Sequence, residues 1–243
     1  MYGLGYGFSF NYLIYFIILM IIPLYAQYKV KGTYNRYKKI KNNSGMTGKE
    51  VAELILKANG IENIKIVKGD VELSDHYNPK DNVVVLSPVV YSQSTIASVA
   101  IAAHEIGHVI QDKIADYKPM RIRHSLVPLA NLGGNLSVVL IMVGMMLTYF
   151  MSLGIGISLA WAGVFLMFFA VLFQIVTLPV EIDASNRALN QIKDLNIVNE
   201  QEKRHCKKVL TAAAFTYLAA AVVALMELGR FILIIINMSN NRD

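Results

Sequence analysis

The chain has 243 residues, of which 55% are hydrophobic and only 16% charged, and its mean hydropathy is +0.44. This composition argues against a soluble globular protein and favours a membrane protein, with the lipid bilayer as partner. The formal charge of +6 does not indicate nucleic acid, because the basic residues flank apolar segments and form no stripe with interleaved aromatic residues. A single cysteine, Cys206, excludes an internal disulfide framework.

Three uncharged runs predict membrane-spanning helices. Residues 8–28 are long enough to cross a hydrocarbon core of about 30 Å, so we expect residues 1–28 to form an N-terminal transmembrane anchor. Residues 1–7 lack Lys and Arg, so this segment is expected to stay attached, unlike a cleaved signal peptide. Residues 126–149 and 153–178 predict a transmembrane hairpin over 126–178, whose glycines allow the two helices to approach closely.

Residues 209–237 predict a fourth transmembrane helix, although they include Glu227 and Arg230. Each charge would cost about 2.5 to 3.5 kcal/mol at the bilayer centre, so the two are expected to form a structural ion pair at i, i+3. A functional relay is the alternative role for this pair. An alternative for the segment is that residues 209–226 pack against the catalytic unit and only its end contacts lipid.

The positive charges predict an orientation in the cell membrane. Lys and Arg residues follow the first span and precede the second and the last, whereas the turn between the second and third spans has none. We therefore expect a multi-pass protein whose polar segments, 29–125 and 179–208, face the cytoplasm. Both termini would then lie outside (N-out, C-out).

The first polar segment predicts a small α+β unit. Residues 47–50 form a T-x-x-E capping box before an amphipathic helix that Asn59 and Gly60 terminate. Residues 64–67 and 83–87 are β-branched runs separated by the turn-rich "SDHYNPKDN", and they are expected to be strands. A long helix is predicted from about Ser94 to Lys113.

The sequence "HEIGH" on this long helix is an H-E-x-x-H motif. Four residues advance a helix by about 400°, so His104 and His108 share a face and can bind one metal ion. Glu105 lies beside that face, where it can act as general base on a zinc-bound water. Zinc with three protein ligands lowers the pKa of that water to about 7. Two ordinary core histidines are the alternative, but they would leave a buried Glu105 without a basic partner on its helix.

The third zinc ligand must come from elsewhere in the chain. The metzincin continuation fails, because Gln111 stands where glycine is required and Ile114 where the third histidine is required. Glu181 is favoured because it begins an amphipathic helix within segment 179–208, just after the third span. The full set of candidates is His76, His124, His205, Glu181 and Asp183.

The stretches "VVVLSPVVYSQSTIASVAIAAHEIGHVIQD", "LPVEIDASNRAL" and "VLTAAAFTYLAAA" resemble the YugP-type neutral zinc metallopeptidases of bacterial membranes over most of the chain. More distantly, the chain is similar to the membrane gluzincins of the Ste24 and HtpX type, in which the Glu of E-x-x-A-D is the third ligand. The resemblance implies zinc (Zn2+) as cofactor, His104, His108 and Glu181 as its ligands, and Glu105 as general base. Ser185 departs from the pattern by replacing its Asp. Asp183 is then expected either to orient a ligand histidine or to pair with Arg187 at i+4.

Three further residues are weaker candidates. His76 and Tyr77, in the turn-rich segment, are candidate oxyanion donors, although turn residues more often form local hydrogen bonds. His205 is a candidate for a catalytic role, although its basic neighbours indicate a solvated face at the membrane boundary. The strand at 83–87 is a candidate edge to which an extended peptide substrate would add.

These features together predict a mainly α, multi-span membrane protein with a small α+β zincin-like catalytic domain. The predicted function is that of an integral membrane zinc metalloendopeptidase acting on peptide or membrane-protein substrates. The alternative is a non-enzymatic scaffold or metal transporter in which the histidines form a structural or transport site. A structural zinc site needs four protein ligands, and a transporter is expected to carry polar residues at mid-span, which the first three spans lack.

Overall fold

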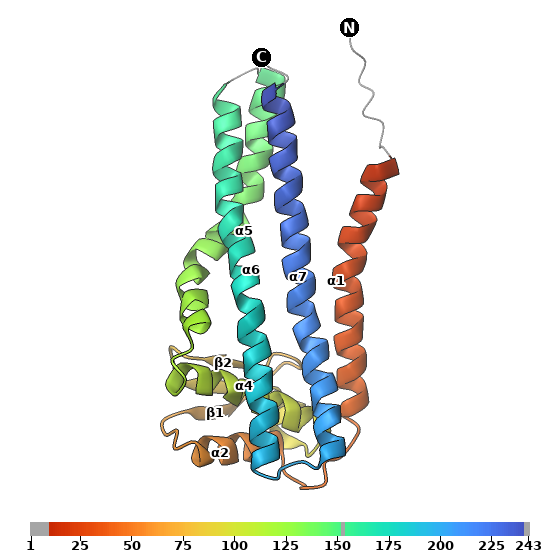
Figure 1. Cartoon of the computed structure of the whole chain (residues 1–243), viewed down its shortest axis with the longest axis vertical. Helices are drawn as coiled ribbons and strands as arrows, with labels where there is room; N and C mark the ends of the chain where they lie inside the picture. The colour runs from red at the N-terminus through yellow and green to blue at the C-terminus, as the bar shows by residue number, and fades with distance from the viewer. Residues whose placement is uncertain (1–9, 152–153, 241–243) are drawn as a thin grey trace.

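The computed structural model describes residues 10–151 and 154–240 and is dominated by long helices. Figure 1 shows α5, α6 and α7 side by side, with α1 standing next to α7 and a small unit of short elements at one end. These four helices are long and apolar enough to cross a membrane, which confirms the mainly α, multi-span class. Their bounds are α1 Phe10–Tyr37, α5 Lys118–Met151, α6 Ile155–Asp194 and α7 Glu200–Asn240.

The long helices extend well beyond the predicted spans. α6 runs without a break past Pro179, so the amphipathic helix expected to begin at Glu181 is the final part of the third spanning helix. This part stays helical because its apolar face, including Ala184, Ala188 and Ile192, is buried in the protein. α1 likewise continues nine residues past Tyr28, to Tyr37. Because of this continuity, the small unit is built directly on the ends of the spanning helices.

The two charged residues within the apolar part of α7, Glu227 and Arg230, pair as predicted. Arg230 forms an ion pair with Glu227 at i, i+3, and the Tyr15 hydroxyl on α1 donates a hydrogen bond of 2.9 Å to Glu227. This cluster links α1 to α7.

The first part of α7, around Val209 and Leu210, is buried in the same core as the small unit, so α7 serves both as a candidate span and as a wall of that unit.

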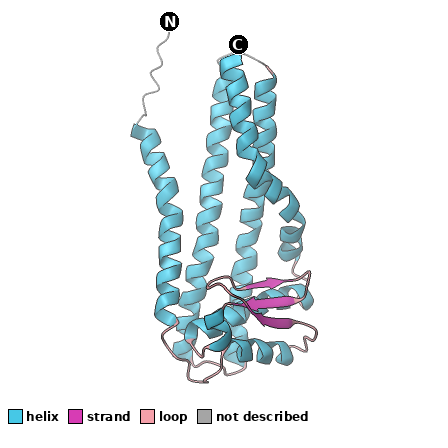
Figure 2. Cartoon of the chain, turned by 180° about the vertical axis from the view of Figure 1, so that it is seen from behind, coloured by secondary structure: helices cyan, strands magenta, loops and turns pink. Residues whose placement is uncertain are grey.

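The small unit is an α+β arrangement. Thr47 and Glu50 form the predicted capping box at the start of α2, with the Glu50 amide donating to the Thr47 hydroxyl. Figure 2 shows the three strands together at the end of the helices. The remaining bounds are α2 Gly48–Ala58, β1 Lys65–Lys68, β2 His76–Asn78, β3 Val83–Leu86, α3 Pro88–Ser92 and α4 Ile96–Lys113.

The sheet differs from the prediction in two respects. The segment predicted to be only a turn contains β2, which pairs antiparallel with β3 so that Tyr77 lies opposite Val84. β1 pairs with the other side of β3 in parallel, and the strand order is β1-β3-β2. The prediction that 83–87 is an edge strand is therefore wrong, because β3 is central. Pairing between segments distant in sequence decides this order.

α4 is the most buried helix of the unit and lies against α6. It begins after Thr95, whose side chain accepts a hydrogen bond of 3.1 Å from the Ser98 amide. A methyl group on Gly107 would lie 2.4 Å from the carbonyl oxygen of Ala184 on α6. The two backbones are therefore in contact at Gly107. The residues of α4 within one turn before or after Gly107 consequently lie close to α6.

The two helices of the predicted hairpin also pack closely. A methyl group on Gly144 of α5 would lie 2.5 Å from the backbone nitrogen of Ala160 on α6, as expected for a small-residue contact between spanning helices. Figure 1 shows the first part of α5 turning away from α6, and Pro128 lies inside this part. Proline removes a helical hydrogen bond and is a common cause of such a bend.

The contact at Gly107 gives a testable prediction. Gly107→Ala should destabilise the protein by about 1 to 3 kcal/mol, because the added methyl group meets a backbone carbonyl that cannot rotate away. Gly134→Ala is the control, since a methyl group there has no neighbour within 4 Å and alanine is the better helix former. Unfolding in detergent, followed by circular dichroism, measures both variants. Equal stability of the Gly107→Ala variant and the wild type would show that the helices do not touch at this point.

Candidate metal centre

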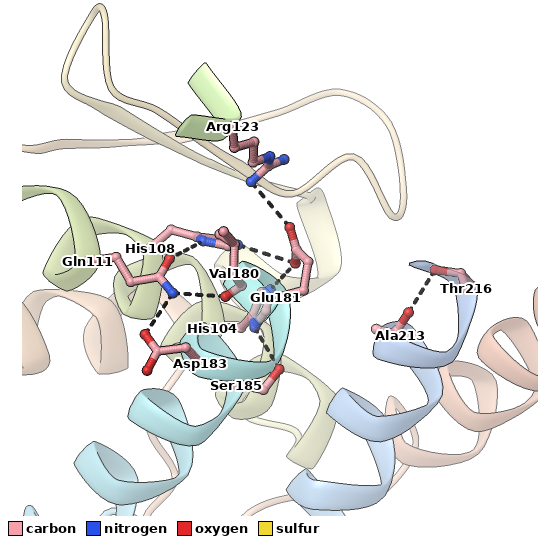
Figure 3. A network of polar contacts seen from close by, with 10 residues as sticks. All are labelled: His104, His108, Gln111, Arg123, Val180, Glu181, Asp183, Ser185, Ala213 and Thr216. Carbon is pink, nitrogen blue, oxygen red and sulfur yellow. Dashed lines mark hydrogen bonds and ion pairs between the residues drawn. The ribbon is translucent and has the colours of Figure 1, made fainter. Parts of the chain in front are cut away.

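Three side chains from two helices converge on one point. α4 supplies His104 and His108, and α6 supplies Glu181 (Figure 3). The Glu181 Oε2 atom lies 3.2 Å from Nε2 of His104 and 3.4 Å from Nε2 of His108. All three potential ligand atoms lie within 4.8 Å of one another. This spacing suits three ligands of a single metal ion.

Both histidines are oriented through their other ring nitrogen. Nδ1 of His104 lies 3.2 Å from the Ser185 hydroxyl oxygen, and Nδ1 of His108 lies 3.0 Å from Oε1 of Gln111. The two Nε2 atoms are thus left to face Glu181. Two imidazoles and one carboxylate form a donor set of catalytic zinc sites, and ligand histidines usually have a partner at the second ring nitrogen. The residues therefore fit a zinc ion.

The structure also places Asp183, for which the sequence left two roles open. Its Oδ2 atom accepts hydrogen bonds of 2.6 Å from Arg187 Nε and 2.8 Å from Gln111 Nε2. Asp183 therefore pairs with Arg187 and, through Gln111, also steadies His108. Figure 3 shows the contacts of Gln111 with His108 and Asp183, and Gln111 Nε2 also donates a hydrogen bond of 2.8 Å to the Val180 carbonyl.

Arg123, on α5, is a site residue that the sequence did not reveal. Its Nη1 atom lies 3.3 Å from Oε1 of Glu181, which is only 2% exposed. Arg123 therefore neutralises Glu181 from the side opposite the histidines. In the sequence Arg123 is one of several basic residues next to an apolar run. Nothing in that pattern distinguishes it from the basic residues that only determine how the protein is oriented in the membrane.

Glu105 is buried beside the three converging side chains. Burial raises the pKa of its carboxyl group, the two imidazoles lower it, and the charges of Asp75 and Glu181 add to the increase, so the net shift is upward. Burial lowers the pKa of His108, but its hydrogen bond to Glu181 and the charges of Glu181 and Glu105 raise it above the ordinary value.

A cavity of about 190 Å³ opens beside His104 and Glu105. Its walls come from α1, through Val30 and Tyr34, and from α7, through residues that include Tyr217. The charges of Glu181 and Glu105 both act on the Tyr217 hydroxyl. The sequence analysis did not single out Tyr217, although it allowed residues 209–226 to pack against the catalytic unit, because no local motif marks this tyrosine. The cavity is large enough to admit water and part of a substrate to the site.

The three weaker candidates make their contacts elsewhere. Nδ1 of the exposed His76 lies 2.8 Å from the Ser74 carbonyl oxygen, as expected of a turn residue. The Tyr77 hydroxyl donates to Asp112 at 2.8 Å and so connects β2 to the end of α4. His205 stacks on Tyr37, with ring centroids 5.1 Å apart. None of the three is among the described residues that line the cavity.

Comparisons with known proteins show the family to which the chain belongs. Residues 12–236 match the protein family described as "Putative neutral zinc metallopeptidase". The chain is 39% identical over 226 residues to the "Putative membrane protease YugP" of Bacillus subtilis (strain 168). The aligned region covers 91% of this chain and 97% of that protein. No solved structure matches the chain. The helices long enough to span a membrane agree with the membrane location in that relative's name, and this chain belongs to the zinc metallopeptidase family that the first description names.

Proposed function

We propose that this protein is an integral membrane zinc metalloendopeptidase. The observation that supports it best is the convergence of His104, His108 and Glu181, with the buried Glu105 and an open cavity beside them. In this proposal the first three residues hold the zinc ion. Zinc with three protein ligands keeps one position open, lowers the pKa of water there to about 7 and polarises a substrate carbonyl.

Glu105 is the proposed general base. It lines the cavity and is not among the three converging donors, so its carboxylate is available to a water molecule that enters there. It would accept the proton of the attacking water and later give that proton to the leaving amine.

Tyr217 is the proposed donor to the developing oxyanion. Tyr217 lines the same cavity as Glu105, so its side chain borders the region in which a peptide carbonyl would react. A hydroxyl positioned there would stabilise the negative charge that forms on the carbonyl oxygen. Tyr77 was the sequence-based candidate for this role, but its hydroxyl is occupied by Asp112.

The walls of the cavity indicate where substrates are cleaved. α1 and α7 are both candidate membrane spans, and both line the cavity. We infer that the substrates are peptides or membrane proteins that approach along the bilayer surface. The basic residues at the ends of the spans support a cytoplasmic position for the site, with both termini outside.

A non-enzymatic metal site is the rival interpretation. A structural zinc site is closed by four protein ligands, whereas the described residues supply a cluster of three next to a cavity. The geometry therefore favours the enzyme, and three substitutions test it.

Glu105→Gln should separate zinc binding from catalysis. The variant should keep about one zinc ion per protein, because residue 105 is not a ligand, while hydrolysis of a fluorogenic peptide library falls by about 10²- to 10⁴-fold. Metal content by mass spectrometry and initial rates in detergent measure the two effects. If purified wild type and variant both bind zinc and neither cleaves any peptide, the protein is not a peptidase.

Glu181→Gln should release the zinc ion. We expect the zinc affinity to fall by more than about 100-fold, because even residues that only support zinc ligands are worth 10- to 100-fold. His205→Gln is the control and should keep its zinc, because His205 stacks on Tyr37 away from the site. Competition with a chromophoric chelator measures both affinities. If the His205→Gln variant lost its zinc and the Glu181→Gln variant kept it, His205 and not Glu181 would be the third ligand.

Tyr217→Phe should lower kcat by about 10²- to 10³-fold while KM and zinc content change little, because the hydroxyl acts only on the transition state. Tyr77→Phe is the comparison and should leave kcat within a few-fold of the wild-type value. Steady-state kinetics on one cleaved peptide distinguishes them. The reverse result would assign the oxyanion donor to Tyr77.

A further inference from the structure

A second, larger hollow lies between α1 and α7 and is separate from the catalytic cavity. It is a groove of about 730 Å³ lined by one face of each helix. The charged residues that line it are all basic. They are Lys29 and Arg36 on α1 and Arg204, Lys207 and Lys208 on α7.

The groove lies where both helices change from apolar to charged. On α1 the uncharged run ends at Tyr28 and Lys29 follows, while on α7 the apolar run begins at Val209, directly after Lys208. Aromatic side chains mark the same level, since Tyr25 and Phe215 pack edge to face with centroids 5.9 Å apart. Such aromatic side chains are typical of the membrane–water interface. The groove therefore opens at the membrane surface, on the side that carries the catalytic unit.

The cations of the groove lack acidic partners. None of the five forms an ion pair with an acidic side chain in the described part of the chain, and no acidic residue lines the groove. Basic residues at the ends of spans commonly extend singly into the headgroup region. Here they converge on one hollow from two helices far apart in sequence, and Thr211 lies among them. This arrangement has the charge and the donors to bind an anion.

We propose that this groove binds the headgroup of an anionic phospholipid from the surrounding leaflet. The lipid phosphate would lie among the lysine and arginine side chains. The acyl chains would follow the apolar surface of α1, where Met20 and Leu24 are 64% and 57% exposed. A free phosphate ion would use the same donors, but the groove's position at the start of the apolar surface favours the lipid.

The bound lipid would also brace the catalytic cavity. The groove and the cavity use different faces of the same two helices, since Thr33 lines the groove and Tyr34 the cavity, and Lys208 lines the groove and Val209 the cavity. A headgroup that contacts both helices would hold α1 against α7. The position of the cavity wall formed by α1 and α7 would therefore depend on whether the surrounding leaflet supplies an anionic lipid.

Native mass spectrometry of the full-length protein in detergent tests this proposal without any measurement of activity. Phosphatidylglycerol or phosphatidylcholine is titrated into wild type and two triple variants, and the apparent Kd of the first bound lipid is measured. Both variants lower the formal charge from +6 to +3. The groove variant is Arg36→Gln, Arg204→Gln and Lys208→Gln. The control variant, outside the groove lining, is Lys31→Gln, Lys39→Gln and Lys203→Gln.

The wild type and the control should bind phosphatidylglycerol in preference to phosphatidylcholine, with excess inorganic phosphate having little effect. The groove variant should bind phosphatidylglycerol at least about tenfold more weakly, because each cation near a membrane surface is worth about fivefold in affinity for anionic lipid. If the triple variant fails to fold, judged by its zinc content and elution volume, the single variants Arg204→Gln and Lys208→Gln should each show about a fivefold loss.

Three outcomes would overturn the proposal. Equal losses in the groove and control variants would show that only the overall surface charge matters. Equal binding of both lipids to the wild type would show that the groove does not recognise the headgroup charge. Displacement of phosphatidylglycerol by inorganic phosphate would show a site for free anions in place of a lipid site.

Discussion

The backbone contact between α4 and α6 at Gly107 is the constraint on which the rest of the site depends. It places a carbonyl of α6 where any larger residue would have a side chain, so the two helices lie closer than an ordinary helix pair. His104 and His108 flank this point on α4, and Glu181 lies nearby on α6. The middle of the motif therefore has a packing role as well as a place between the two proposed histidine ligands.

This close packing buries several charged and polar groups, and burial of such groups is costly unless each has a partner. Glu181 is satisfied from two sides, by the imidazoles and by Arg123. Gln111 and Ser185 orient the histidines, and Gln111 is fixed in turn by hydrogen bonds to Val180 and Asp183. A fully paired network of this kind holds its members in one geometry, as a site preorganised for metal binding requires.

α1 has a different relation to the fold, because it stands beside α7 and outside the bundle of α5, α6 and α7 (Figure 1). Contacts along its length hold it there, from Tyr15 with Glu227, through Tyr25 with Phe215, to Tyr37 with His205. One face of this helix pair lines the cavity beside His104 and Glu105, and another face forms the basic groove. The membrane anchor is therefore also part of the wall of the proposed active site.

The sequence by itself determined the features that depend on neighbouring residues: the uncharged runs, the capping box at Thr47, and the helix that carries His104 and His108 one turn apart. For the proposed third ligand, the sequence could only favour Glu181 among several candidates. Glu181 lies 77 residues from His104, and no local sequence pattern predicts that two such distant residues are in contact. Only the tertiary structure decided that Ser185 contacts Nδ1 of His104, that Arg123 neutralises Glu181, and that β3 is central in the sheet. Each of these depends on contacts between elements far apart in the chain, and the close packing of helices sets those contacts.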